Sequence, residues 1–200
     1  MSDLRPNSAS PPEILHAPWR FSYMKMLSAA ANKQANKGKA ESSQPSPCFL
    51  RDYFLHPELD ESNHVVVRTG NATINAGGMI LLNGYPYANG HLLVCLGIGR
   101  QRLMDYTDQE RAELWSLVDL AVDLCERTLP VQGVNVGVNQ GLAAGAGVPE
   151  HLHVHVVPRW QGDVNFTTAV ANIRVLPSSL EDMAARYREV WSNRRTELGL

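Results

Sequence analysis

Three of the seven histidines in this 200-residue chain lie within five residues of one another, at His151, His153 and His155. They alternate with apolar residues in HLHVHVVPRW (151–160), a pattern typical of a β-strand with one face in a core. Side chains two apart share a strand face, so the three imidazoles should point the same way, about 7 Å apart. Three groups that ionise near neutral pH disfavour each other's charged forms, so the cluster is costly unless it serves chemistry.

Two kinds of chemistry fit three imidazoles on one face. One is a metal site, because imidazole is a ligand that Zn²⁺ prefers. The other is nucleophilic attack on phosphorus by one neutral ring, with its neighbours donating hydrogen bonds. The preceding glycine-rich loop (140–149) favours the second, since backbone N–H groups in such loops bind anions. Only Glu150 and Asp163 lie nearby in sequence, so carboxylates that could orient metal-bound histidines are sparse.

Hydropathy patterns predict the elements that must position this cluster. The expected strands are 64–68, 71–76, 79–84, 91–97, 133–139 and 151–160. A long helix is expected over about 108–129, and a second over 178–191, where Ser and Glu occupy capping-box positions. Strands and helices do not alternate regularly, so the pattern favours the antiparallel α+β class over a doubly wound sheet.

The first part of the chain differs from the rest. Residues 28–47 contain no aromatic or large aliphatic side chain, and we expect a mobile linker there. The apolar segment 17–27 should dock on the body of the protein. We therefore expect an N-terminal arm over 1–61 and a single catalytic domain over 62–200.

The composition excludes several classes of protein. Eighteen basic and 20 acidic side chains give a formal charge of −2, which offers no general attraction for nucleic acid or membranes. No apolar run approaches the roughly 20 residues of a membrane helix, and the start lacks the apolar segment of a secretory signal. The odd, widely spaced cysteines predict a reducing, cytoplasmic compartment and small buried thiols, namely Cys48, Cys95 and Cys125.

The residues resemble the histidine triad (HIT) family. The run HLHVHVV (151–157) fits the pattern His-φ-His-φ-His-φ-φ at every position, and LLNGYPYANGHLLV (81–94) is similar to the family's Asn-x-x-Pro-x-x-x-Gly-His segment. The runs HVVPRWQGDVNF (155–166) and APWRFSYM, near the N-terminus, resemble the diadenosine tetraphosphate phosphorylase branch. The resemblance covers most of 17–27 and 62–195.

This resemblance implies a central antiparallel sheet of about five strands with one long and one C-terminal helix, assembled as a homodimer. It also implies nucleotidyl transfer or hydrolysis at the α-phosphate of nucleotide polyphosphates or phosphoramidates, with no cofactor required. In the implied mechanism His153 is the nucleophile, His155 contacts the scissile phosphate or leaving oxygen, and His151 orients the nucleophile. The residues implied for substrate binding are Asn83, His91, Asn139, Gly145, Ala146, Gly147 and Trp160.

Two departures from the family pattern sharpen the prediction. Many members carry Gln four residues before the triad, where this chain has Gly147, so a side-chain amide donor is missing. That favours phosphorolysis, with inorganic phosphate as co-substrate, over hydrolysis. Some relatives carry a Cys-x-x-Cys zinc pair, but CFLR (48–51) has Arg51 in the second position, so we expect no structural zinc.

The expected reaction is a double displacement through a nucleotidyl-His153 intermediate, which phosphate or water then attacks. Three alternatives stay open from the sequence. They are nucleoside phosphoramidate hydrolysis, a slow nucleotide-binding module, and a metal-dependent hydrolase.

Overall fold

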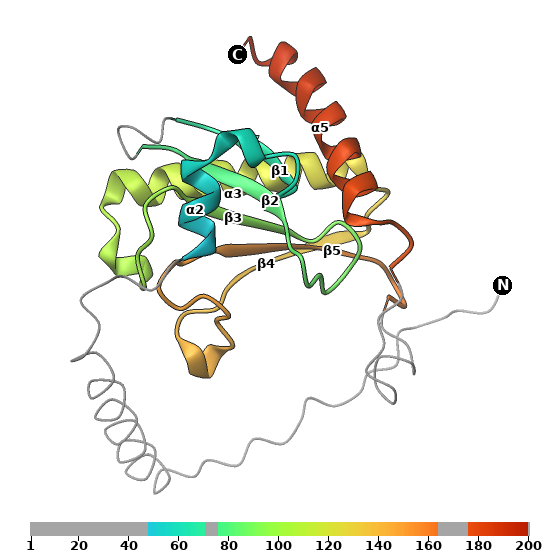
Figure 1. Cartoon of the computed structure of the whole chain (residues 1–200). Helices are drawn as coiled ribbons and strands as arrows, with labels where there is room; N and C mark the ends of the chain where they lie inside the picture. The colour runs from blue at the N-terminus through green and yellow to red at the C-terminus, as the bar shows by residue number, and fades with distance from the viewer. Residues whose placement is uncertain (1–47, 71–75, 164–175, 200) are drawn as a thin grey trace, which may run out of the picture. The chain divides into compact units, whose positions relative to one another are not determined.

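A sheet of five antiparallel strands in the order β1-β2-β3-β5-β4 organises the part of the chain that the structure describes (Figure 1). The structure is a computed structural model and describes residues 48–70, 76–163 and 176–199. The strands are β1 (Val65–Arg68), β2 (Gly78–Leu82), β3 (Leu92–Leu96), β4 (Gly133–Val138) and β5 (Val154–Arg159). The α+β class with a central antiparallel sheet is confirmed. The expected strand 71–76 and the linker 28–47 lie outside the described residues, apart from Ala76.

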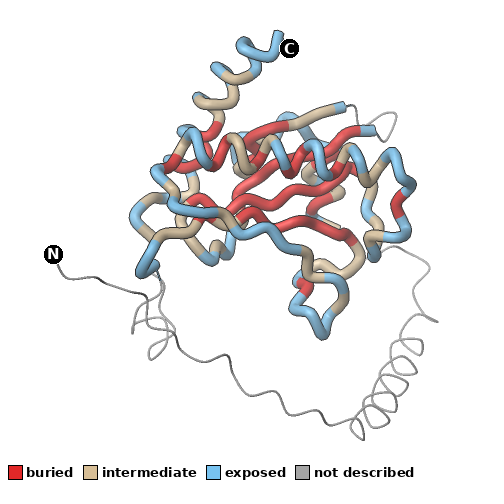
Figure 2. The backbone as a smooth tube through the Cα atoms, turned by 180° about the vertical axis from the view of Figure 1, so that it is seen from behind, coloured by how far each residue is buried: buried red, intermediate tan, exposed pale blue. Residues whose placement is uncertain are grey.

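Both faces of the central strands are buried, as the continuous buried stretches in Figure 2 show. Ile80 and Val94 belong to a core cluster that also includes the apolar faces of α3 (Asp108–Thr128) and α5 (Leu180–Glu197). Met79 and Leu93 point to the opposite face, where they pack with Leu50 and Phe54 of α2 (Phe49–Leu55). The period-2 alternation of the strands thus divides their apolar side chains between two layers of helix.

The two long helices begin at side-chain caps. Thr107 accepts a bond from the Glu110 N–H, and the Glu110 carboxylate accepts one from the Thr107 N–H, which forms a capping box. At α5 the cap is Ser179, which accepts from the Asp182 N–H. The cap therefore lies one residue later than the Ser178–Glu181 spacing predicts, and the helix extends to Glu197 rather than 191.

Helix α2 falls inside the range expected as an N-terminal arm, yet it packs on the sheet. Leu50 and Phe54 are 0% and 1% exposed. Arg68 holds the end of the helix, because its guanidinium donates to the main-chain oxygens of Tyr53 and Phe54 and pairs with Asp60. The compact unit that contains α2 spans Ser46–Leu200 and so begins before the expected boundary at 62.

The expected strand 151–160 is shorter in the structure, since β5 begins only at Val154. Before it, the His151 N–H donates to the Val148 oxygen in a turn, and the Leu152 N–H donates to the Arg100 oxygen. Within β5, His155 lies opposite Leu93 of β3 and Gly137 of β4. Only the last histidine of the triad is therefore part of the sheet ladder.

Strand β4 is an edge of the sheet, and most of its residues are exposed. Short 3₁₀ turns at Pro57–Leu59, Leu103–Asp105 and Leu142–Ala144 complete the connections. Among the described helices, none combines the length and apolar character that a membrane crossing requires.

Candidate active site

Four histidines come together where β3 and β5 pair. His151, His153 and His155 are 0%, 6% and 9% exposed, and His91, directly before β3, is 0% exposed. The alternate residues Leu152, Val154 and Val156 face the core beneath α3 and α5, as the sequence pattern predicts. The ring centroids of His153 and His155 are 5.1 Å apart, and those of His91 and His155 are 5.2 Å apart.

The proton on His153 is placed by a main-chain carbonyl. Its Nδ1 lies 2.9 Å from the His151 oxygen, which can only accept a hydrogen bond. Nδ1 therefore carries the proton, and in the neutral ring Nε2 has a free lone pair. This is the tautomer that a nucleophilic histidine requires.

His91 and His155 form a proton-ordered pair. The Tyr87 N–H donates to His91 Nδ1 over 3.1 Å, so the proton of neutral His91 is on Nε2. That Nε2–H donates to His155 Nδ1 over 3.0 Å, which leaves the proton of neutral His155 on its own Nε2. Burial, and then the neighbouring His153, lower the pKa of His155 to about 4. His155 is thus a neutral hydrogen-bond donor at pH 7.

Asn139 lies beside this donor. Its amide nitrogen is 3.4 Å from His155 Nε2, and both nitrogens carry protons. Two adjacent N–H donors repel one another but suit an oxygen of an anionic ligand that bridges them. Asn139, at the end of β4, and His155, in β5, therefore present a donor pair that a phosphate oxygen can accept from.

His151 is held on both ring nitrogens. Nε2 lies 2.8 Å from the Leu96 oxygen, so it carries the proton, and Nδ1 lies 3.1 Å from Cys48 Sγ. Burial is the main cause that lowers the pKa of His151 and keeps the ring neutral. Its side chain is thus directed into the protein, while its main-chain oxygen holds His153.

The segment before β3 supports His91. Asn83 accepts a bond from the Tyr85 N–H at Oδ1, and its Nδ2 lies 3.3 Å from His91 Nδ1. Tyr87 stacks on His155 with centroids 5.7 Å apart and ring planes 18° apart. Sequence reasoning missed Tyr87, although an aromatic ring inside a turn of glycine, proline and asparagine was a signal for it.

The glycine-rich loop is more self-contained than its sequence predicts. Gly145 adopts φ +88°, and its N–H donates to the Leu142 oxygen. The Ala146 N–H donates to the Gly141 oxygen, and Ala146 is buried. Gly147 is exposed. To bind an anion with the backbone N–H groups of Gly145, Ala146 and Gly147 together, the loop would have to break the two internal hydrogen bonds of Gly145 and Ala146.

Trp160 lies apart from the histidines of its own chain. It follows the end of β5, about 16 Å along the strand direction from His155. Its indole Nε1–H donates to the Pro130 oxygen over 2.9 Å, and its ring packs against the main core. The structure therefore gives Trp160 a packing role and does not bring it together with the triad.

No group of three His, Cys, Asp or Glu side chains in the described ranges is arranged to hold a metal ion. Cys48 and His151 approach one another, but the Arg51 guanidinium comes from the same turn of α2 and donates to the Gly97 oxygen. Gly99 contributes no side chain beside the His151 ring. Cys48 and His151 are only two ligands, and the positive charge of Arg51 is nearby. This arrangement does not fit a structural zinc, which takes four ligands.

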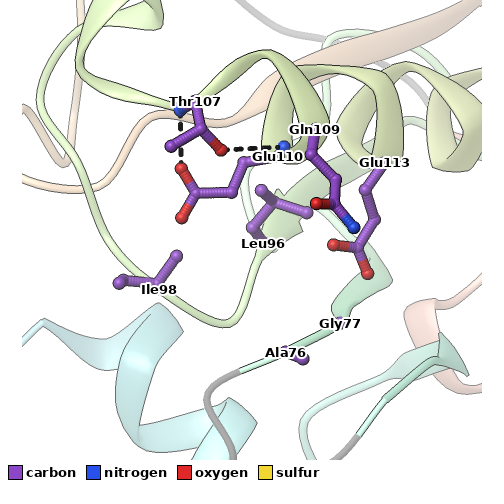
Figure 3. Close-up of a pocket in the computed structure, with 8 residues that line it drawn as sticks. All are labelled: Ala76, Gly77, Leu96, Ile98, Thr107, Gln109, Glu110 and Glu113. Carbon is purple, nitrogen blue, oxygen red and sulfur yellow. Dashed lines mark hydrogen bonds between the residues drawn. The ribbon is translucent and has the colours of Figure 1, made fainter.

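A pocket of about 220 Å³ lies elsewhere, between the first turns of α3 and the end of β3 (Figure 3). Glu110 points into it from the capping box with Thr107, and it is also paired with Arg100. None of the four histidines lines this pocket, so it is separate from the candidate active site.

Comparisons with known proteins point to one family. The model of the HIT domain matches residues 75–162. The AP-4-A phosphorylase of Mycobacterium tuberculosis is 35% identical over 178 residues, which cover 89% of this chain and 84% of that protein.

Solved structures share the fold. A hypothetical histidine triad nucleotide-binding protein from Sulfolobus tokodaii aligns with a TM-score of 0.58 and 23% identity, over 76% of this chain and 97% of its own. A Zn-bound histidine triad family protein from Mycobacterium smegmatis aligns with a TM-score of 0.54 and 21% identity, over 75% and 96%. With a relative of this identity and coverage, and with the triad in place, the chain belongs to the HIT family.

Proposed function

We propose that this chain is a nucleotidyl transferase that cleaves dinucleoside polyphosphates of the diadenosine tetraphosphate type. One observation carries the proposal. The His151 oxygen accepts the Nδ1–H of His153, so the Nε2 lone pair of the ring in its neutral form lies beside a neutral donor, His155. A nucleophile and a donor of this kind suit displacement at a phosphorus with a good leaving group.

In the first step Nε2 of His153 bonds to the α-phosphorus, and the bond from that phosphorus to the bridging oxygen breaks. The leaving nucleotide takes the electron pair, and the Nε2–H of His155 donates a hydrogen bond to it. His153 becomes a nucleotidyl-imidazolium whose Nδ1–H stays on the His151 oxygen. In the second step an oxygen of inorganic phosphate bonds to the same phosphorus, the P–N bond breaks, and neutral His153 is restored. For diadenosine tetraphosphate the products are ATP and ADP.

Two features favour phosphate over water as the second acceptor. Gly147, four residues before the triad in the sequence, has no side chain, and a Cβ there would meet no atom within 4 Å, so that position is open to a second anion. The Mycobacterium tuberculosis relative is named as an AP-4-A phosphorylase. The donor pair of Asn139 and His155 would then meet the oxygens of the transferred phosphoryl group.

The test is incubation with diadenosine tetraphosphate, with and without inorganic phosphate, followed by chromatography of the products. The expected result is ADP plus ATP that form only when phosphate is present, and no turnover by a His153→Ala control. Formation of AMP plus ATP at a rate that does not depend on phosphate would mean that the reaction is hydrolysis and not phosphorolysis. Release of AMP from a nucleoside phosphoramidate alone would overturn the substrate class.

We also propose that the protein is a homodimer joined at β4. This edge strand has the sequence GVNVGV, with no charged residue or proline to block pairing, and Val136 is 41% exposed. Exposed edge strands without such protection pair with other chains. A Val136→Lys variant should therefore sediment as a monomer where the wild type sediments as a dimer, and a wild-type monomer would refute the proposal.

No metal cofactor is part of the proposed reaction. Near the Cys48–His151 contact, Gly99 supplies no side chain, and Arg51 donates to the Gly97 oxygen. Turnover should survive prolonged EDTA treatment, and loss that zinc restores would contradict this. A reducing, cytoplasmic setting is proposed as well, because all three cysteines are free and Cys48 acts as a thiol donor.

A further inference from the structure

A thiol from the start of α2 reaches the triad. Cys48 Sγ lies 3.1 Å from His151 Nδ1, although the two residues are 103 positions apart in sequence. The Leu96 oxygen fixes the His151 proton on Nε2, so Nδ1 is an acceptor and the Cys48 S–H must donate to it. Burial raises the pKa of Cys48, in keeping with a protonated thiol.

The contact closes a chain of bonds that ends at His153. The thiol holds Nδ1 of His151, the Leu96 oxygen holds its Nε2, and the main-chain oxygen of the same residue holds Nδ1–H of His153. A Cβ on Gly99 would lie 2.9 Å from His151 Nδ1, so the glycine leaves the ring the space that it occupies. The position of the His151 ring therefore fixes the orientation of the main-chain carbonyl of the same residue.

Helix α2 places the thiol. The Cys48 oxygen accepts the Asp52 N–H over 3.0 Å in the first turn of the helix, and the Arg51 guanidinium donates to the Gly97 oxygen, next to Leu96. Leu50 and Phe54 anchor the helix in the core. The first turn of α2 therefore contacts both the end of β3 and the first histidine of the triad.

We infer that Cys48 is a positioning residue for the nucleophile: its S–H holds the His151 ring, and the His151 carbonyl holds the tautomer and aim of His153. This inference rests on the proposed function for its kinetic part only. Loss of the donor leaves a buried acceptor on His151 without a partner, which favours a moved or re-protonated ring. The nucleophile then loses its fixed orientation while the substrate-binding groups keep theirs.

The experiment compares four full-length proteins: wild type, Cys48→Ala, Cys48→Ser and the control Cys95→Ala. Cys95 lies in the core cluster under α2, so its replacement also removes a buried sulfur there. Two kinds of measurement are made. Steady-state kinetics give kcat and KM for phosphorolysis of diadenosine tetraphosphate, and NMR gives the ¹⁵N shifts of the assigned imidazoles at pH 7. Urea unfolding confirms that each variant is folded.

We expect Cys48→Ala to lower kcat about tenfold or more at unchanged KM and to shift the ring nitrogens of His151 and His153. Cys48→Ser keeps a donor and should restore kcat to within about threefold of wild type. Cys95→Ala should leave kcat and the imidazole shifts near wild type. A shift of the two rings on Cys48→Ala supports the positioning role even if no dinucleoside polyphosphate is turned over, in which case only the proposed function fails.

Three results would overturn the inference. One is unchanged His151 and His153 shifts in Cys48→Ala. Another is an equal loss of kcat in Cys48→Ala and Cys95→Ala, which would mean that packing alone is responsible. The third is a Cys48→Ser variant as impaired as Cys48→Ala, because the donor would then be irrelevant.

Discussion

Acidification from pH 6.5 to pH 4 should destabilise the folded chain through His155. Burial and the adjacent His153 lower the pKa of His155 to about 4 in the folded state, whereas an unfolded histidine titrates near its ordinary value of about 6.5. Below about pH 6.5 His155 binds a proton in the unfolded chain but stays neutral in the folded chain, so the equilibrium moves toward unfolding. The stabilisation is complete above about pH 6.5 and is lost as the pH falls toward 4.

The expected size follows from the two pKa values. Each pH unit between them corresponds to about 1.4 kcal/mol, so His155 accounts for a loss on the order of 3 kcal/mol in the free energy of unfolding. His155 is only 9% exposed, so solvent screening removes little of this. The buried His151, whose pKa is also lowered, contributes in the same direction.

The assay is urea unfolding at a series of pH values from 7 to 4.5, for wild type, His155→Asn and the control His56→Asn. His155→Asn removes the titrating ring and keeps a small polar group. The loss of stability of this variant over the pH range should therefore be smaller than that of the wild type by about 2–3 kcal/mol. His56 is exposed, so His56→Asn controls for the loss of a histidine that lies outside the buried cluster. An equal acid loss in wild type and His155→Asn would refute the reasoning. So would an NMR titration of His155 centred near 6.5, because a charged His155 could not accept the His91 Nε2–H.

The remaining predictions concern single side chains. His153→Ala should lower kcat for the transfer reaction by at least about 10³-fold without unfolding the chain, and retention of most activity would exclude it as the nucleophile. His91→Phe keeps the ring volume but removes the donor to His155 Nδ1, so kcat should fall about tenfold in steady-state assays. Gly90→Ala would add a Cβ 2.6 Å from Leu129 Cδ1 and 2.8 Å from Tyr187 Oη at a φ of +78°. It should lower the free energy of unfolding by about 2–4 kcal/mol in urea titrations, and an unchanged midpoint would contradict the close approach of Leu129 and Tyr187 to Gly90.

The sequence was enough to predict the sheet and the placement of the triad on one face. Apolar alternation in 151–156 identifies Leu152, Val154 and Val156 as core residues, and this holds even though β5 begins only at Val154. Alternation reports which side of an extended backbone is buried. It does not report where ladder hydrogen bonds begin, because the Leu152 N–H takes its partner from the Arg100 oxygen, which lies outside any strand.

Helix α2 and its contact with His151 could not be predicted in the same way. The segment 48–55 is short, follows a polar stretch and carries only two fully buried residues, Leu50 and Phe54. A helix of seven residues is not stable by itself and exists here because tertiary contacts hold it, including those of Arg68. The partner of Cys48 lies 103 residues away, and no local pattern encodes a contact at that distance.

The glycine-rich loop illustrates a different limit. Composition predicted that the glycine-rich loop 140–149 binds an anion, since glycines free the backbone to form anion-binding turns, and the resemblance to the HIT family implied the amides of residues 145–147 within it. In the structure two of these amides are already paired with the Leu142 and Gly141 oxygens. Composition identifies a backbone that is able to bind an anion. The donors that are free to do so depend on the turn that actually forms.

The proton arrangement of the site has its origin in main-chain groups. The Tyr87 N–H determines which nitrogen of His91 carries the proton, and His91 in turn determines this for His155. The main-chain oxygens of His151 and Leu96 determine the tautomers of His153 and His151, respectively. Main-chain N–H and C=O groups do not titrate, so these tautomers persist wherever the rings are neutral. Burial keeps the two outer triad rings neutral by lowering their pKa values. In a chain with a net charge of only −2, directed donors of this kind would meet the oxygens of the proposed polyphosphate substrate locally, and the sign of the overall charge says little about such a site.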